Sequence, residues 1–378
     1  MSLKKWFCTK VFAAWQWYNY VEQQIEGNAD LLRVNLDETS ICMYLGGRKG
    51  NVFMSRSEPA VEHVRLGQRR AYMTHVAMIC DNASVQPHLP QILIANERTL
   101  PLRMFADIRS RLPANVLLLR RSSAWNTSTL CAAIVRRLAA ALAVHAARYQ
   151  AVLLLDVHKC HLGAAMLAAC RARGIWPLFV PPKVTWLLQP LDVYTFHQFK
   201  LFLVRDCLRA RIRSRDSAAY DVPRLVDCLC NAIRCVLEGR SWAYAFDRCG
   251  FGQHQAALGE RVRSALQISG VPPISDAQPT REQFQCCFPK RVVAPVACLA
   301  APRELPTARA VAPLSDAAAV ASSPLHPPMY PRRSARLAAM LAAPPPPPER
   351  ADASAAPAVS APAACSVWAM RLRRRRSS

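Results

Sequence analysis

Residues 151–155 (AVLLL) form a short run that is apolar at every position and ends directly at Asp156. An alternating strand buries one face, whereas a run without polar positions is typical of a strand covered on both faces. Residues 175–180 (IWPLFV) are a second such run, and Pro181 and Pro182 end it. Strands buried on both sides need helices on both sides, so these runs favour an α/β fold.

The rest of the first 270 residues alternates between strand-like and helix-like pieces. Further strands are predicted over residues 32–36, 71–80, 91–95 and 116–119. Helices are predicted over residues 1–27, 128–147, 163–173 and 193–213. Asn126 and Thr127 are capping candidates for the second helix, and Gly174 ends the third. This order predicts a mixed sheet with helices on its faces.

Composition changes near residues 268–273. Of the 29 prolines, 19 lie from Pro272 onward, and alanine, serine and arginine fill most of the remaining positions. Proline at this density prevents helices and ladders, so residues 271–378 are predicted to be a mostly disordered tail. The predicted organisation is therefore a helical segment at 1–29, an α/β domain at 30–270, and the tail at 271–378.

The chain is strongly basic. It has 49 Lys and Arg against 25 Asp and Glu, a formal charge of +24. The electrostatic field of such a charge favours binding to polyanions, first nucleic acid and second an anionic membrane surface. Coding bias toward arginine and alanine is an alternative source of the charge. The tail ends in an arginine cluster of nuclear-localisation or polyanion-binding type; a solvated chain end is the alternative. Its members are Arg371, Arg373, Arg374, Arg375 and Arg376.

Cysteine usage and hydropathy indicate a reduced, intracellular chain. Fifteen cysteines occur without a CxxC pair, and neither Cys228 with Cys230 nor Cys286 with Cys287 has structural-zinc spacing. The first residues do not read as a secretory signal, and the best apolar stretch, 138–147, is too short to span a bilayer. We therefore expect mostly free thiols and no membrane association.

Three aspartates stand out by position. Asp37 ends the first predicted strand, Asp156 ends the apolar run, and Asp192 opens the last predicted helix. Carboxylates at the ends of neighbouring strands converge, repel one another and attract a divalent cation, which is the requirement for two-metal phosphoryl chemistry. The alternative for each is a structural cap, and Asp192 before a helix is a natural N-cap.

The motifs around these aspartates resemble the DDE superfamily endonuclease domain of pogo-like transposases, a branch of the mariner superfamily. The second motif, Asp-x-x-x-x-His, is met by Asp156 and His161 after the apolar strand. The third, Leu-Pro-Pro-x-x-Thr-x-x-Leu-Gln-Pro-Leu-Asp, is met from its first proline onward by residues 181–192. The first, Asn-x-Asp-Glu-Thr, is residues 35–39, and Ser-Ala-Trp-Asn at 123–126 also has a counterpart. The resemblance runs from about residue 30 to about residue 250.

The resemblance implies a ribonuclease H-like fold and a metal-dependent DNA endonuclease or transposase. Asp37, Asp156 and Asp192 would be the catalytic carboxylates and would hold two Mg²⁺ or Mn²⁺ ions. It also implies DNA as partner, a homodimer on paired DNA ends and a nuclear location. The alternative reading is a decayed or domesticated DNA-binding protein that keeps the fold and basic surface without cleavage.

The sequence departs from the family pattern in two places. Val157 and Lys159 stand inside the second motif, where small polar residues are usual. About 30 residues precede the first motif, too few for the helix-turn-helix modules of the family, so recognition of terminal repeats is not expected from this chain.

Smaller signals have both functional and structural interpretations. The basic residues Lys159, Arg205, Arg209 and Arg213 are candidate phosphate contacts, with a solvated helix face as the alternative. Trp125 and Trp186 could stack on bases, but packing is the favoured interpretation. His158, Cys160, His161 and Asp156 lie within six residues and cannot easily surround a zinc ion, so His161 is expected to support Asp156 or to start a helix.

Overall fold

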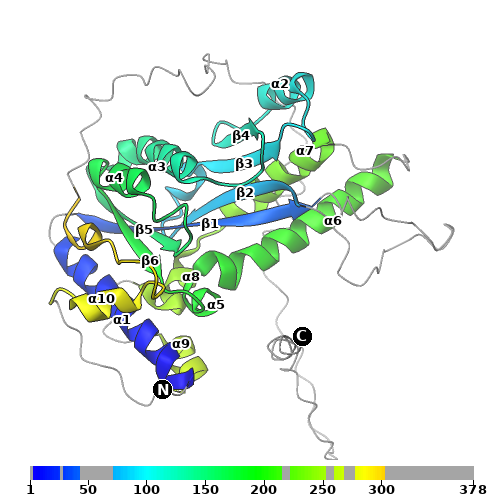
Figure 1. The fold of residues 1–378 in the computed structure, drawn as a ribbon. Helices are drawn as coiled ribbons and strands as arrows, with labels where there is room; N and C mark the ends of the chain where they lie inside the picture. Colours follow the sequence, from blue (N-terminus) through cyan, green and yellow to red (C-terminus); the bar gives the residue numbers. More distant parts are fainter. Residues whose placement is uncertain are drawn as a thin grey trace, which may run out of the picture. The chain divides into compact units, whose positions relative to one another are not determined.

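The computed structural model describes residues 3–25, 29–42, 71–214, 222–252, 259–267 and 277–302. Six strands of these residues form one mixed sheet in the order β4-β3-β2-β1-β5-β6 (Figure 1). They are β1 (Asp30–Cys42), β2 (Ala71–Cys80), β3 (Gln91–Asn96), β4 (Val116–Arg121), β5 (Tyr149–Asp156) and β6 (Ile175–Val180). The first three strands are antiparallel, β5 and β6 continue from β1 in parallel, and β4 is parallel to β3. The predicted strands and the predicted mixed α/β sheet with flanking helices are confirmed.

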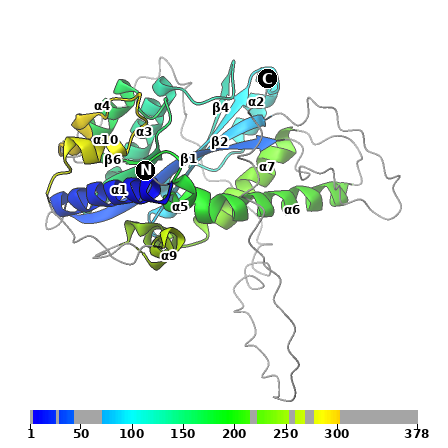
Figure 2. The same ribbon diagram turned by 60° about the horizontal axis from the view of Figure 1, so that its bottom comes forward.

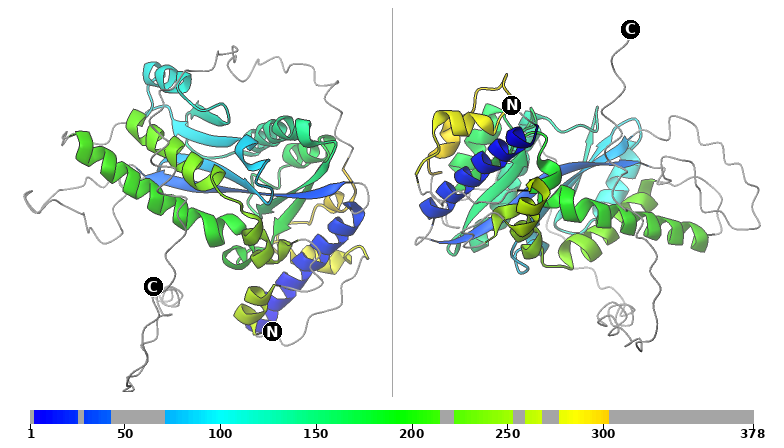
Figure 3. Two further views of the ribbon diagram at one scale, coloured as in Figure 1. Left: turned by 180° about the vertical axis from the view of Figure 1, so that it is seen from behind. Right: turned by 90° about the horizontal axis from the view of Figure 1, so that it is seen from below.

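Helices cover both faces of this sheet. They are α1 (Leu3–Ile25), α2 (Leu102–Ser110), α3 (Ser128–Leu142), α4 (Ala164–Ala172), α5 (Thr185–Leu188), α6 (Phe196–Ser214), α7 (Val222–Ala232), α8 (Ala243–Phe246), α9 (Glu260–Leu266) and α10 (Arg281–Cys286). Helices α3 and α4 lie on one face and α6 crosses the other (Figure 2). From behind, α6 and α7 are seen side by side (Figure 3), and Asn231 of α7 donates a hydrogen bond to Asp206 of α6 at 2.8 Å.

Local sequence signals set the helix ends near the sheet. The Thr127 hydroxyl accepts a hydrogen bond from the Leu130 amide and so caps α3, as predicted. Gly174, just past α4, has a φ of +67°, the left-handed conformation that glycine adopts without strain. The interior of β5 is completely buried, as its apolar run predicts for a strand covered on both faces.

Among the described residues, the stretch 128–145 alone is long and apolar enough to cross a membrane. This judgement rests on length and composition, and 44% of the stretch is buried inside the protein. Buried residues of α3, including Leu138 and Leu142, belong to the hydrophobic core. A helix in a protein core can have the same length and composition as a membrane-spanning helix. Helix α3 packs as a core helix.

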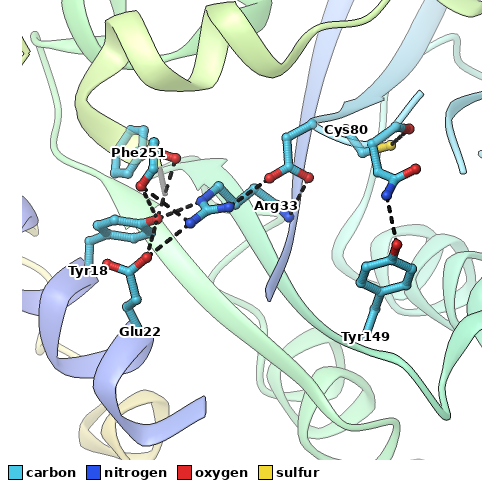
Figure 4. A network of polar contacts seen from close by, with 9 residues as sticks. Tyr18, Glu22, Arg33, Cys80, Tyr149 and Phe251 are labelled. Carbon is cyan, nitrogen blue, oxygen red and sulfur yellow. Dashed lines mark hydrogen bonds and ion pairs between the residues drawn. The ribbon is translucent and has the colours of Figure 1, made fainter. Parts of the chain in front are cut away.

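Helix α1 is bound to the sheet through a buried arginine (Figure 4). Arg33 of β1 is 1% exposed and donates to Glu22 of α1 at 3.0 Å and to Asp81 at 2.8 Å. Its Nε also donates to the Tyr18 hydroxyl. A buried guanidinium is stable only when paired in this way. Helix α1 lies within the helical segment predicted at 1–29, and it packs into the same core as the sheet.

Residues 277–302 also fold onto α1. Thr280 and Gln283 form a reciprocal capping box that starts α10. The rings of Phe284 and Phe288 lie 4.8 Å and 6.1 Å from Trp17 of α1. The prediction of a disordered tail from residue 271 is therefore wrong for this stretch, because a few aromatic residues between the prolines suffice to fill a gap in the core. The remaining tail, with the arginine cluster at 371–376, lies outside the described residues.

Candidate active site

Asp37 lies within β1 rather than at its end. The sequence predicts that this strand ends at Asp37, but β1 runs to Cys42, because β2 pairs with residues 34–42. Pairing with β5 stops earlier, at Asn35 with Leu154. Asp37 therefore lies just beyond the end of the β1–β5 ladder, at the level where Asp156 ends β5. The parallel pairing brings the two aspartates to the same edge, as the sequence predicted.

Asp192 reaches this edge through a turn that a buried asparagine holds. The turn is a π-helical segment, Leu191–Thr195, which continues into α6. The Asn35 side chain is fully buried; it donates to the Leu154 carbonyl at 3.1 Å and accepts from the Leu191 amide at 2.8 Å. Through these two hydrogen bonds, Asn35 connects β1 to both β5 and the turn. Asp192 lies inside this segment, whose N-cap position is Pro190, so Asp192 is not the N-cap of the helix.

The three carboxylates act on one another electrostatically. Burial, followed by the charges of Asp192, Glu38 and Asp156, raises the pKa of Asp37 well above its usual range. The pKa of Asp192 is also raised, by burial and then by Asp156, while hydrogen bonds with Thr185 and Asp37 oppose the shift. Mutual repulsion of this kind is what a bound divalent cation relieves. Three carboxylates are also the hard oxygen donors that Mg²⁺ and Mn²⁺ prefer, so the residues fit these ions.

A buried histidine orients Asp156 from behind. His161 is fully buried and donates from Nδ1 to Asp156 Oδ1 at 2.7 Å and from Nε2 to Glu38 Oε1 at 3.1 Å. Burial would lower the pKa of His161, but hydrogen bonds with Asp156, Cys131, Cys160 and Glu38 raise it well above its usual value. The prediction that His161 supports Asp156 agrees with these contacts.

Glu38 and Asn126 complete this layer. Asn126, a predicted cap of α3, instead donates its side-chain amide to Glu38 Oε1. Burial would raise the pKa of Glu38, but the hydrogen bonds from His161 and Asn126 outweigh it, and the pKa is lowered. The sequence predicts no role for Glu38 and only a capping role for Asn126, because the partners of both residues are distant in sequence.

Two tryptophans flank the carboxylates on the outside. Trp125 is 74% exposed and precedes Asn126, and Trp186 is 51% exposed and follows Thr185. The favoured interpretation is packing in the core or at its rim, and the structure excludes the core for both indoles. Each tryptophan is next in sequence to a residue that hydrogen bonds with Glu38 or Asp192, so both exposed indoles lie near the site.

The predicted basic contacts are not gathered at the site. Lys159 is exposed three residues after Asp156. Arg205 and Arg209 are exposed on α6, and Arg205 is 13 residues beyond Asp192, about 20 Å along a helix. The side chain of Arg213 lies outside the described residues. Lys200 was not predicted as a site residue, but its positive charge opposes the rise in the pKa of Asp192.

Comparison with known proteins finds a similar family. A family model described as DDE superfamily endonuclease matches residues 73–245. This part of the chain is therefore similar to DDE superfamily endonucleases. The matched region contains Asp156 and Asp192 and begins after β1, which holds Asp37.

One solved structure is similar to the chain, the Mos1 transposase paired-end complex with left transposon end. The sequence identity is 14% and the TM-score is 0.32; the match covers 64% of this chain and 63% of that one. The chain thus spans less than two thirds of that transposase. No curated protein matches the chain.

Proposed function

We propose that this domain is a divalent-metal-dependent DNA nuclease of the transposase type, in the pogo-like branch that its motifs resemble. The observation that carries the proposal is the meeting of Asp37, Asp156 and Asp192 at one sheet edge, where burial and then the charges of the neighbouring carboxylates raise the pKa of Asp37. The substrate is a DNA phosphodiester, and strand transfer to a second DNA follows cleavage. A homodimer acting on paired ends in the nucleus belongs to the same proposal.

Asp37, Asp156 and Asp192 would hold two Mg²⁺ or Mn²⁺ ions. Bound there, such ions supply an activated water or DNA 3′-hydroxyl and neutralise charge at the leaving 3′-oxygen. The protein keeps the carboxylates in place for this. His161 fixes the orientation of Asp156, and Asn35 fixes the turn that presents Asp192.

The outer residues suit a nucleic-acid substrate. Trp125 and Trp186 offer exposed ring faces on which unpaired bases can stack. Lys159 is exposed next to the motif and would contact a substrate phosphate. These residues bind and position DNA, and the three aspartates are the catalytic residues.

The test is nicking of a supercoiled plasmid by the purified full chain. Activity with Mg²⁺ or Mn²⁺, absent in EDTA, is expected, and Asp156→Asn should reduce it by at least about 1000-fold because one ligand is lost. Asp227→Asn is the matched control: the same substitution at a carboxylate that pairs with Arg111 on the exposed surface.

Two outcomes would count against the proposal. DNA binding without nicking in either metal would leave a non-cleaving DNA-binding protein. Nicking that is equal in wild type and Asp156→Asn would mean that a contaminating nuclease, or a different site, does the cutting.

A further inference from the structure

A second group of metal-ligating side chains lies behind the carboxylates. Glu38, Cys131, Cys160 and His161 each offer one ligand atom, and these four atoms lie within 4.8 Å of one another. They come from β1, from α3 and from the segment after β5. Both thiols and the imidazole are buried, and Glu38 is half-buried. The proposed nuclease chemistry uses neither cysteine.

The contacts inside the group already resemble a coordination shell. The thiol sulfurs of Cys131 and Cys160 lie within 4.8 Å of each other and of the His161 ring nitrogen. The His161 Nε2 to Glu38 Oε1 distance is 3.1 Å. Two ligand atoms at ordinary zinc bond lengths in a tetrahedron are about 3.4 to 3.8 Å apart. The pair of His161 and Glu38 is already close to this spacing. No other pair, at 4.8 Å or less, has to close by more than about 1.5 Å.

The residues around the four ligands are those that support a bound metal. The other ring nitrogen of His161 donates to Asp156 at 2.7 Å, and a metal-bound histidine commonly donates to a carboxylate in this way. His158 Nδ1 lies 2.9 Å from Cys160 Sγ, where an N–H donor stabilises a thiolate. Asn126 donates to Glu38 and fixes its carboxylate.

We infer that Glu38, Cys131, Cys160 and His161 form a zinc site with four protein ligands. Two thiolates, an imidazole and a carboxylate are donors that zinc accepts, whereas Mg²⁺ and Mn²⁺ favour oxygen ligands. Four protein ligands leave no open position, which makes the site structural. Zinc enters by replacing the two thiol protons and the proton between His161 and Glu38.

The sequence alone argued against zinc because His158, Cys160, His161 and Asp156 are too close together to surround an ion. The structure resolves this difficulty. Glu38 and Cys131 reach the site from distant elements and take the places of His158 and Asp156, which support the ligands instead. Bound zinc would fix the ring of His161 and, through it, the orientation of Asp156.

The test uses the purified full chain, stripped of metal under reducing conditions. Titration with Co²⁺ should give the thiolate-to-metal charge-transfer absorption and the intense visible bands of a tetrahedral site. Zinc content after dialysis should be one ion per chain. Cys131→Ser and Cys160→Ser should each weaken zinc binding by at least about 100-fold, because a hydroxyl is a poor zinc ligand. Cys249→Ser, a buried cysteine outside the group, should leave it unchanged.

A measurement on the wild-type chain covers the case in which the serine variants do not fold. Zinc should protect Cys131 and Cys160 from alkylation in the native protein, as read by peptide mass spectrometry, and millimolar Mg²⁺ should not. Equal alkylation of these two cysteines with and without zinc would overturn the proposal, as would a Co²⁺ spectrum without thiolate bands. Neither readout depends on DNA cleavage, so the zinc site and the proposed nuclease can fail separately.

Discussion

Asn35 shows how one buried side chain sets the geometry of the site. Its side-chain amide hydrogen bonds with the Leu154 carbonyl and the Leu191 amide. These two backbone groups are buried, so water could not take the place of Asn35 as their partner. We predict that Asn35→Ala lowers the free energy of unfolding by about 3 kcal/mol, because both buried groups lose their partner. Urea unfolding measures this.

The matched control for Asn35 is Asn96→Ala. Asn96 also makes two side-chain hydrogen bonds, to Ser122 and Arg98, but at the surface, where water replaces them. The control should cost no more than about 1 kcal/mol. Equal losses in the two variants would show that Asn35 does not join the strands to the turn.

His75 makes the stability of the fold depend on pH. It is fully buried on β2, donates to Gln91 at 3.1 Å and packs against Phe199 of α6. Burial lowers the pKa of His75 to about 4, against the opposing hydrogen bond with Gln91. The unfolded chain takes up this proton at about pH 6.5, so the stabilisation is complete above that pH and is lost as the pH falls toward 4.

The free energy of unfolding of the wild type should fall between pH 7 and pH 5. We predict that this fall is about 2 kcal/mol smaller in His75→Leu. Urea unfolding at the two pH values measures this, and His197→Leu, at an exposed histidine, should behave as wild type. An unchanged pH dependence in His75→Leu would show that His75 is not held neutral.

At the scale of elements, α10 tests whether the segment after residue 277 is part of the core. Phe284 is 1% exposed and its ring meets Trp17 edge-to-face. Phe284→Ala should lower the free energy of unfolding by about 3 to 5 kcal/mol, as other buried phenylalanines do. Val293→Ala, at a side chain that is 82% exposed, should have almost no effect. If Phe284→Ala is equally silent, the segment does not pack as described.

The elements also show how far sequence reasoning reaches. The fully apolar β5 and the capped helix α3 are local patterns, and they were predicted because local chemistry decides them. The length of β1 was not, because its last residues are held by pairing with β2. Helix α10 was not predicted, because the high proline content of this region indicated disorder. The few aromatic residues that pack against α1 are not recognisable from the sequence pattern.

The site divides in the same way. The convergence of Asp37, Asp156 and Asp192 could be predicted because each stands in a spaced motif. The contacts of Glu38, Asn126 and Cys131 could not be predicted. Asn126 meets Glu38, and Glu38 and Cys131 meet His161 and Cys160, only through the packing of β1, α3 and β5. Exposure of Trp125 and Trp186 likewise depends on the whole fold.

At the scale of the whole molecule, the charge of +24 predicts the character of DNA binding. Four or more phosphate contacts would weaken binding by at least about 100-fold between 50 and 200 mM salt. Fluorescence anisotropy of a labelled duplex measures the slope of log affinity against log salt. Replacing Lys159, Arg205 or Arg209 by alanine should reduce the slope by about 0.9 for each residue that contacts a phosphate. A salt-independent affinity would contradict electrostatic binding.

The central claim is that three aspartates from β1, β5 and the turn before α6 form one divalent-metal site. Counting bound Mn²⁺ by electron paramagnetic resonance, with a short DNA duplex present, tests it most directly. The account predicts two Mn²⁺ ions per wild-type chain and a loss of this binding when Asp37, Asp156 and Asp192 are all changed to Asn. Equal Mn²⁺ binding by the wild type and the triple variant would contradict it.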